Sequence, residues 1–307
     1  MISISCADYA FPLLPREQRF ALLRLLGFEY VDLGLFERSE GLRPGQLLAE
    51  PRKFARQLKR DLIHAGLRAS DVFLQTGVTL EDAAENNPSG IVRAQHRKTF
   101  ILILELCADL ECTHVTGLPG VLHKDVGDKA SFELAVEEMG WRQRVASSAG
   151  ICYAIKPHVD SICSDVEQAH KLLDAVPDLS LTLDYGHFVF QRISSRHVHN
   201  LLPYASHVHM RGSTPQRLQL PLHESSIDFQ GIIRRLFKNR YPGFLAITYL
   251  REVWNKCDRT DNVSETILLR KQLMESLPPE PAKTNQAEAR SAASLVRGTW
   301  PQSSPAT

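Results

Sequence analysis

Short apolar runs alternate with longer amphipathic segments along the first 277 residues. Eight runs have the length and character of buried strands, and seven longer segments place apolar residues at helical spacing. The predicted strands are 2–5, 30–33, 71–75, 114–116, 152–156, 181–184, 207–210 and 244–248. The predicted helices are 16–26, 53–65, 91–110, 132–149, 166–175, 229–238 and 263–274, with a weaker helical signal at 195–202.

This alternation predicts a parallel sheet, and eight repeated units predict closure into a single (β/α)8 TIM barrel. Gly27, Gly66 and Gly150 each follow a predicted helix and precede a strand, where glycine can take the left-handed conformation that ends a helix. A doubly wound open sheet is the alternative. It is disfavoured because no G-x-G-x-x-G follows the first strand.

The composition changes after Leu277. Four residues, Pro278-Pro279-Glu280-Pro281, end the last predicted helix, and the remainder is rich in Ala, Ser, Pro and Gln. We therefore expect a barrel domain at 1–277 and a flexible, mostly disordered tail at 278–307. A short helix near 288–296 is the alternative for part of the tail.

Charge and composition limit the classes of partner that the protein is expected to bind. A net charge of +1 gives no bulk field that would attract nucleic acid or an anionic membrane, and the apolar run near 101–106 is too short to cross a bilayer. Met1 leads directly into the first strand without a secretory signal, and the six cysteines form no C-x-x-C pair. We expect a cytoplasmic protein with free thiols and a small-molecule substrate, and a homo-oligomer remains open.

Polar side chains cluster where the last four predicted strands end. The segments are Lys156-Pro157-His158, Asp184-Tyr185-Gly186-His187, His207-Val208-His209-Met210-Arg211 and Thr248-Tyr249. In a barrel these strand ends meet at one mouth, where Asp and His are ligand types for a divalent metal. A single such residue commonly satisfies only local backbone groups, whereas the repetition favours a functional site. His209 is nearer the mouth than His207, so His209 is the better ligand candidate and His207 is the one that could be structural.

These same residues carry a family resemblance. The segments 181–188 and 207–212 resemble strands six and seven of the xylose isomerase-like sugar phosphate isomerases and epimerases. Supporting matches lie at 156–161, 241–244 and 261–266, and the convincing coverage runs from about residue 113 to residue 277. The resemblance implies a divalent metal held by Glu on strand five, Asp on strand six, His on strand seven and Glu on strand eight, with both Glu also transferring protons.

The resemblance assigns roles to individual positions. Asp184 and His209 match two of the metal ligands. His209, Arg211 and Tyr249 are the expected substrate contacts. The expected catalytic residues are Lys156, His158, Asp184 and His187.

Two positions depart from the family pattern. Lys156 replaces the strand-five Glu and Thr248 replaces the strand-eight Glu, so the usual pair of acid/base carboxylates is missing. An ammonium about 4 Å from a divalent ion is repelled by roughly 8 kcal/mol at an effective dielectric of about 20. We expect Lys156 to pair with Asp184 in the metal's place, and therefore no cofactor or one weakly bound Mn, Mg or Zn ion. Alternatively, Lys156 points away and a loop acid (Asp160, Glu224 or Glu252) supplies the missing ligand.

The resemblance and the two departures leave three candidate functions. The first is a sugar isomerase- or epimerase-like enzyme, or a lyase, for a small polyhydroxylated or carbonyl-containing substrate, with Lys156 as a base or Schiff-base nucleophile. The second is a non-catalytic binding or scaffold protein that retains the barrel pocket. A DNA repair endonuclease, an activity known on related barrels, is disfavoured because it needs several metal ions and a basic groove.

Overall fold

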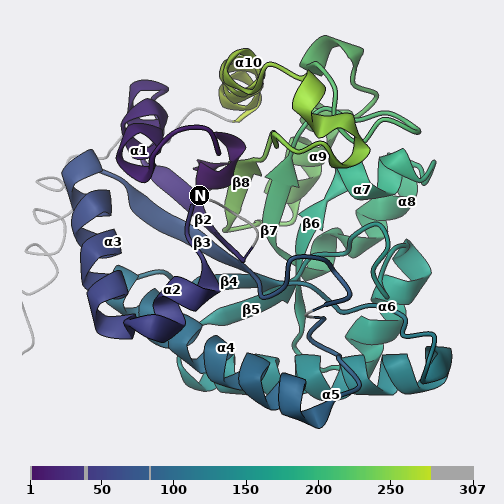
Figure 1. Cartoon of the computed structure of the whole chain (residues 1–307). Coiled ribbons are helices and arrows are strands. Elements are labelled where there is room, and N and C mark those ends of the chain that lie inside the picture. The colour runs from purple at the N-terminus through teal and green to yellow at the C-terminus, as the bar shows by residue number, and fades with distance from the viewer. Residues whose placement is uncertain (1, 38–40, 83, 278–307) are drawn as a thin grey trace, which may run out of the picture.

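Eight parallel strands form a closed barrel in the order of the sequence (Figure 1). The computed structural model describes residues 2–37, 41–82 and 84–277, so the predicted tail lies outside the described residues. The strands are β1 (Ser3–Ala7), β2 (Tyr30–Phe36), β3 (Arg68–Gln75), β4 (His114–Gly117), β5 (Cys152–Ile155), β6 (Ser180–Asp184), β7 (Ala205–Met210) and β8 (Phe244–Ile247). Since β1 pairs with both β2 and β8, the predicted barrel is confirmed and the open sheet is excluded.

Helices surround the barrel and cover its outer surface (Figure 1). The seven predicted helices are all present, as α1 (Arg16–Leu25), α3 (Pro51–Ala65), α4 (Gly90–Leu110), α5 (Gly127–Ser148), α6 (Val166–Ala175), α9 (Phe229–Lys238) and α10 (Asn262–Ser276). The weak signal at 195–202 corresponds to α8 (Ser195–Val198) and the 3-10 helix η2 (His199–Tyr204). The sequence reading did not predict α2 (Pro44–Ala49), α7 (Tyr185–Phe190) or the 3-10 turns η1 (Asp8–Ala10), η3 (Leu222–Glu224) and η4 (Trp254–Arg259).

Side chains and glycines fix the helix ends as expected. Asp165 and Asp261 accept backbone N–H groups in the first turns of α6 and α10, which satisfies donors that have no partner inside a helix. Gly66 follows α3 with φ +67°, and Gly27 and Gly150 lie just past the ends of α1 and α5 with φ +85° and +72°. All three glycines are in the left-handed region, so their predicted role in ending helices is confirmed.

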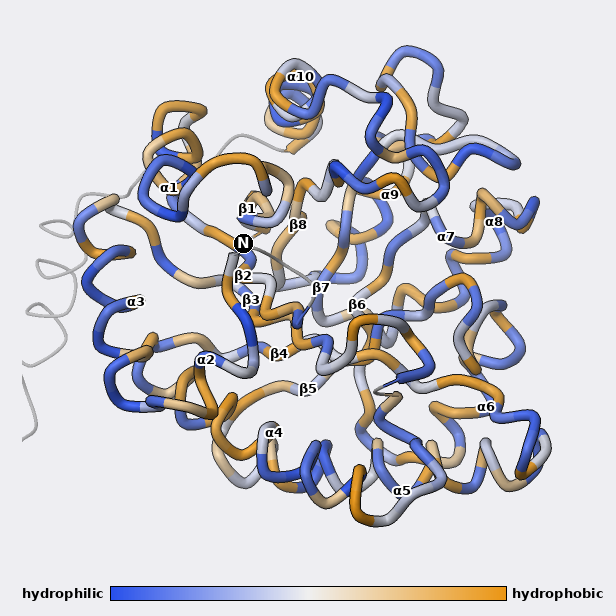
Figure 2. The backbone as a smooth tube through the Cα atoms, in the orientation of Figure 1, coloured by the Kyte–Doolittle hydropathy of each residue, from blue (hydrophilic) through white to orange (hydrophobic). Residues whose placement is uncertain are grey.

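The strands present two different faces. Val31, Leu33 and Leu35 alternate along β2 and belong to the apolar core between sheet and helices. Figure 2 shows hydrophobic and hydrophilic stretches alternating along the surrounding helices. The opposite face of the sheet is polar: Asp32 of β2 contacts His207 of β7, although these strands are not neighbours in the sheet. Their contact therefore crosses the inside of the barrel, which is lined by polar groups.

The cysteines and the helix lengths bear on two expectations from the sequence, free thiols and no helix that spans a membrane. The six cysteines are all free, and only Cys152 is not fully buried. Among the described residues, no helix combines the length and the apolar character needed to cross a membrane.

Candidate functional site

A cavity of about 610 Å³ opens at the carboxyl ends of the strands. Three predicted site residues, Lys156, His158 and His187, belong to its wall. Four aromatic side chains also line it, from Tyr9, Phe36, Phe73 and Trp254. Because catalytic groups of (β/α) barrels lie at this end of the strands, this cavity is the candidate active site.

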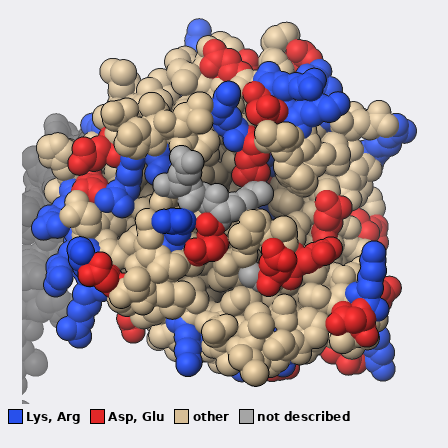
Figure 3. Space-filling model, viewed as in Figure 1, with Lys and Arg blue, Asp and Glu red and all other residues tan. Residues whose placement is uncertain are grey.

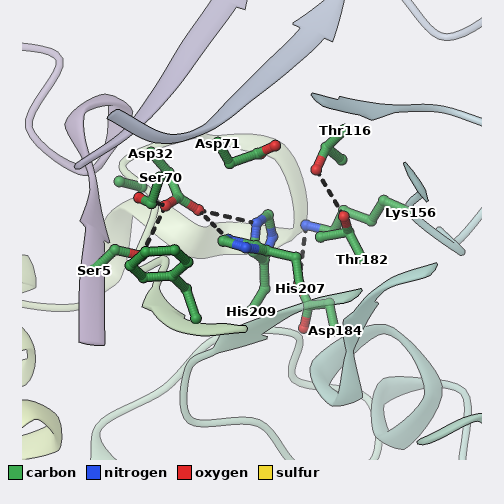
Figure 4. Close-up of polar contacts among 12 residues, drawn as sticks. Ser5, Asp32, Ser70, Asp71, Thr116, Lys156, Thr182, Asp184, His207 and His209 are labelled. Carbon is green, nitrogen blue, oxygen red and sulfur yellow. Dashed lines mark hydrogen bonds and ion pairs between the residues drawn. The ribbon is translucent and has the colours of Figure 1, made fainter. Parts of the chain in front are cut away.

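Lys156 points into this mouth and pairs with Asp184 (Figure 4). Lys156 Nζ lies 3.0 Å from Asp184 Oδ2, so the predicted ion pair is present. Arg211 Nη2 donates to the same oxygen from 3.0 Å, and the Gly186 N–H donates to Asp184 Oδ1 from 2.9 Å. All three charged side chains are buried. One carboxylate therefore serves two cations, and both of its oxygens already accept hydrogen bonds.

The pKa values of Lys156 and Asp184 depend on each other and on Arg211. Burial lowers the pKa of Lys156, the carboxylate of Asp184 opposes that shift, and Arg211 adds to the lowering. Burial alone would raise the pKa of Asp184, but Arg211 and Lys156 together hold it below its ordinary value. Asp184 therefore stays ionised, while Lys156 gives up its proton more readily than an exposed lysine.

Two histidines form the adjacent wall. The ring nitrogens of His187 face donors on both sides, with Arg211 Nη2 at 2.9 Å from Nε2 and the Val159 N–H at 3.3 Å from Nδ1. Burial and the neighbouring cations lower the pKa of His187 well below its ordinary value. The His158 ring lies 4.0 Å from that of His187 and stacks on Trp254, and burial followed by Lys156 lowers its pKa to about 3. Both imidazoles are neutral near pH 7.

Loop acids and a hydroxyl complete the mouth. Asp160 and Glu252 line the cavity, whereas the exposed Glu224 pairs with Arg217 at 2.6 Å and is not among the described lining residues. Glu252 is one of the smaller influences that raise the pKa of Lys156, so its carboxylate lies near the ammonium. Thr248 lines the cavity, and its buried hydroxyl has no hydrogen-bond partner among the described residues.

Other predicted site residues lie behind the wall. Asp184, His209 and Arg211 are almost completely buried and are not among the described residues that line the cavity. Tyr249 is fully buried too, and its hydroxyl accepts the Gly212 N–H at 3.1 Å. The substrate contact predicted for Tyr249 has no support in this geometry, because the side chain orders the segment after β7 instead. Arg211 does not reach the cavity itself, but its guanidinium contacts Asp184 and His187, the second of which lines the cavity.

A second polar cluster lies inside the barrel (Figure 4). One ligand atom from each of Asp32, Asp71, His207 and His209 can be chosen so that all four lie within 4.8 Å of one another, and all four residues are buried. His207 Nε2 lies 2.7 Å from Asp32 Oδ2, and His209 Nε2 lies 3.5 Å from the same oxygen. These residue types could hold a divalent metal.

Sequence reasoning missed Asp32 and Asp71. Each is a single acid within a predicted strand or at its edge, without a neighbouring motif. The available signal was their strand parity, because a charged residue between apolar positions of a buried strand must find a partner inside the barrel.

The mouth does not fit the metal that the resemblance implies there. Asp184 Oδ2 accepts from two cationic side chains, so a divalent ion beside it would face Lys156 and Arg211. His209, the other predicted ligand, is the register partner of Asp184 on β7, but its Nε2 lies 3.5 Å from Asp32 Oδ2. The described residues hold a pair of cations where the family would hold a metal.

Both charge signs are interspersed on the face of the molecule in Figure 3, with no continuous basic stripe across the described part of that face. A nucleic-acid backbone is bound through rows of Lys and Arg. This view gives the endonuclease alternative no support.

Comparisons with known proteins agree with this architecture. A family model described as a xylose isomerase-like TIM barrel matches residues 20–273. A solved structure of L-ribulose 3-epimerase has a TM-score of 0.70 and 17% identity, covering 97% of this chain and 99% of that chain. A probable 3-DHS dehydratase from Bacillus anthracis has a TM-score of 0.65 and 12% identity, covering 88% of this chain and 99% of that chain.

A xylose isomerase-like TIM barrel protein from Mycobacterium smegmatis, solved in complex with magnesium, has a TM-score of 0.68 and 15% identity. That match covers 90% of this chain and 96% of the other. A comparison with curated proteins by sequence finds no match. At these identities the structural likeness establishes the fold.

Proposed function

Because the chain belongs to the xylose isomerase-like TIM barrel family, we propose that it is a sugar isomerase- or epimerase-like enzyme with an altered active site. Its substrate is a small polyhydroxylated or carbonyl-containing molecule, and the Lys156 ammonium acts where relatives would use a divalent cation. The carrying observation is that Lys156 lines the cavity while its Nζ lies 3.0 Å from Asp184 Oδ2.

A cation at this position has a clear chemical use. Removing a proton beside a carbonyl group places negative charge on the carbonyl oxygen, and a fixed positive group in a dry site stabilises that charge. Lys156 carries this charge at the cavity wall, and Arg211 keeps Asp184 ionised behind it. In this proposal Asp184 and Arg211 position the lysine, and Lys156 contacts the substrate.

Proton transfer needs an acceptor and a donor. The loop after β8 contributes Glu252 to the cavity, and the segment after β5 contributes the neutral imidazole of His158. We propose that these two groups replace the missing strand-end carboxylates. The cavity volume of about 610 Å³ suits a small substrate.

Hydrogen exchange gives a test that does not require knowing the product. The purified chain is incubated in D₂O with a panel of ketoses and keto acids, and NMR follows exchange of the proton beside the carbonyl. We expect wild-type exchange on at least one substrate without added Mn²⁺ or Mg²⁺, its loss in Lys156→Met, and partial retention in Lys156→Arg. Dependence on added metal, or unchanged exchange in Lys156→Met, would overturn the proposal.

Lys156 has a second chemical possibility, which is nucleophilic attack on the substrate carbonyl to form a Schiff base. Its lowered pKa supports this because the neutral amine is the nucleophile. Borohydride reduction in the presence of each substrate would then leave a stable mass increase on the peptide that contains Lys156. If the wild-type protein shows no mass increase, Lys156 acts by electrostatic stabilisation alone.

A non-catalytic binding protein is the second candidate. The observation that favours it is the replacement of both family carboxylates, by Lys156 and Thr248. Saturable binding of a panel member by calorimetry, without any deuterium exchange, would support this candidate over the enzyme.

A further inference from the structure

The polar cluster inside the barrel has features that the mouth chemistry does not use. It joins Asp32 of β2, Asp71 of β3, and His207 and His209 of β7 across the barrel interior. We propose that these four side chains bind one divalent transition-metal ion, for which Zn²⁺ is the best match. This site is separate from the Lys156–Asp184 pair and does not rest on the proposed function.

Outer hydrogen bonds already orient both carboxylates, and those of Asp32 are drawn in Figure 4. Asp32 Oδ1 accepts from the hydroxyls of Ser5 and Ser70 at 2.7 and 2.6 Å, and Asp71 Oδ1 lies 2.7 Å from His114 Nδ1. One oxygen of each carboxylate is thereby fixed. Asp71 Oδ2 has no hydrogen-bond partner among the described residues, and Asp32 Oδ2 faces the two histidines of the cluster. Protein metal sites commonly hold their first-shell ligands through this kind of second hydrogen bond.

Unpartnered polar atoms supply the second observation. Neither ring nitrogen of His209 has a hydrogen-bond partner, and Asp71 Oδ2 also has none, among the described residues. His209 is 1% exposed and Asp71 is 0% exposed, so water in the surrounding solvent cannot satisfy them. Buried polar atoms without partners are uncommon and costly, and an ion bound between them would remove that cost.

The ligand types select the ion. Two imidazole nitrogens and two carboxylate oxygens suit tetrahedral Zn²⁺, whereas Mg²⁺ and Ca²⁺ prefer sites made of oxygen alone. Coordination would replace the hydrogen bond between His207 Nε2 and Asp32 Oδ2, which now lie 2.7 Å apart, and a neutral imidazole bound through Nε2 would carry its proton on Nδ1.

The test measures metal binding by the full chain. Zn²⁺ is offered both to the chelator-treated folded protein and during refolding, because the cluster is buried and entry could require opening. Competition with a chromophoric chelator gives affinity, and elemental analysis gives stoichiometry. We expect one equivalent in wild type, with Mg²⁺ unable to compete, and loss of that equivalent in His209→Ala and Asp71→Asn.

Two further variants keep the result interpretable. Ser70→Ala retains all four ligands but removes one hydrogen bond to Asp32, so affinity should fall by about tenfold or more. His96→Ala is the matched control, because His96 is also buried with an unpartnered Nδ1 but belongs to α4 and not to the cluster. It should bind one equivalent as wild type does.

Circular dichroism checks that each variant is folded. Absence of a saturable equivalent in wild type under both loading conditions would overturn the site, as would identical binding by wild type and Ser70→Ala. Deuterium exchange that depends on Lys156 is measured without added metal, so failure of this site is distinguishable from failure of the proposed enzyme.

Discussion

Asp184 is surrounded by more positive than negative charge. Lys156 Nζ and Arg211 Nη2 each lie 3.0 Å from its Oδ2, and the side chains are 0–5% exposed. Lys156 Nζ also lies 5.5 Å from the ring centre of Phe73, whose face attracts a cation. The two cations therefore share a single carboxylate, and the members of this group should differ strongly in what their removal costs.

The residue-scale prediction is an asymmetry between two substitutions. Asp184→Asn leaves two buried cations without an anion, which should lower the free energy of unfolding by about 3–5 kcal/mol. Lys156→Met leaves Asp184 paired with Arg211 and should cost less than about 2 kcal/mol, because an apolar chain of similar length packs beside Phe73. Urea unfolding measures both. A larger loss for Lys156→Met would show that the lysine is needed to stabilise the fold.

A second residue-scale prediction concerns acid. The pKa of His158 in the folded chain is about 3, below the ordinary value of 6.5, so below about pH 6.5 the unfolded chain binds a proton that the folded chain does not. Its stabilising contribution is complete above that pH and is lost as the pH falls toward 3. In His158→Gln, the loss of unfolding free energy between about pH 7 and about pH 5 should shrink by about 2 kcal/mol, because the unfolded histidine takes up its proton over about 1.5 pH units of this interval.

The control for this measurement is His223→Gln, since the His223 side chain is 78% exposed. This substitution measures how much of the change comes from removing an exposed histidine and not from removing His158. Equal pH dependence in wild type and His158→Gln would mean that the folded chain protonates His158 as easily as the unfolded chain.

The sequence predicted the mouth better than the barrel interior. Lys156, Asp184 and His187 follow strands in short motifs, so strand order alone brings them together, and the pairing of Lys156 with Asp184 follows from charge. Asp32 and Asp71 carry no such motif. Their partners, His207 and His114, are 175 and 43 residues away, and only the closed barrel brings them within 2.7 Å.

Helices with an apolar stripe and a capping side chain were predicted more accurately than helix ends and short helices that lack these signals. The bounds of α6 and α9 agree with the predicted helices, because each has an apolar stripe and a capping aspartate. Helix α5 begins five residues earlier than predicted, at Gly127, where its first turn has no side-chain cap that the sequence could reveal. Helix α7 was missed because Asp184, assigned to a strand end, also caps the helix that follows.

The element-scale prediction concerns the segment after β7, which carries Arg211. A Cβ on Gly212 would lie 2.6 Å from the Leu220 carbonyl oxygen and 3.2 Å from the Tyr249 hydroxyl. Since Leu220 O is a backbone atom, the segment itself must move, and Gly212→Ala should lower the free energy of unfolding by about 1–3 kcal/mol. Deuterium exchange activity should fall as well, because Arg211 holds Asp184.

Gly90→Ala is the matched control for this substitution. Gly90 begins α4, and its added Cβ would meet only Arg93 Nη2, 4.0 Å away. Alanine favours helix more than glycine does, so stability should stay unchanged or rise by up to about 1 kcal/mol. Equal losses in the two variants would mean that the close approach at Gly212 relaxes without cost.

At the scale of the whole molecule, the repeated strand and helix pattern was sufficient to predict the architecture. The motifs that suggested the family begin near residue 113, whereas the family model matches residues 20–273. The first strand lies outside both, yet β1 closes the barrel by pairing with β8 through Ser3, Ile4, Ser5 and Cys6. A closed parallel barrel needs every unit, so eight correct strands determine the topology. The details of the cavity wall could not be predicted, since loops such as 78–82 contribute to it and have no periodic signal.

The last prediction concerns what completes the domain at its carboxyl end. Helix α10 ends at Ser276, and its Leu269 and Leu273 are fully buried in the core, while Glu265 Oε2 accepts the Leu222 N–H at 2.6 Å. The sequence after Leu277 lacks the apolar spacing needed to add to that core. We therefore expect a chain that ends at Leu277 to melt within about 5 °C of the full chain, since that interval corresponds to roughly 1–2 kcal/mol for a domain of this size. A chain that ends at Asp261 lacks α10 and should fail to fold, because two buried leucines and the Glu265 contact are lost together. Differential scanning calorimetry distinguishes the outcomes, and a larger drop for the chain ending at Leu277 would show that residues 278–307 stabilise the barrel.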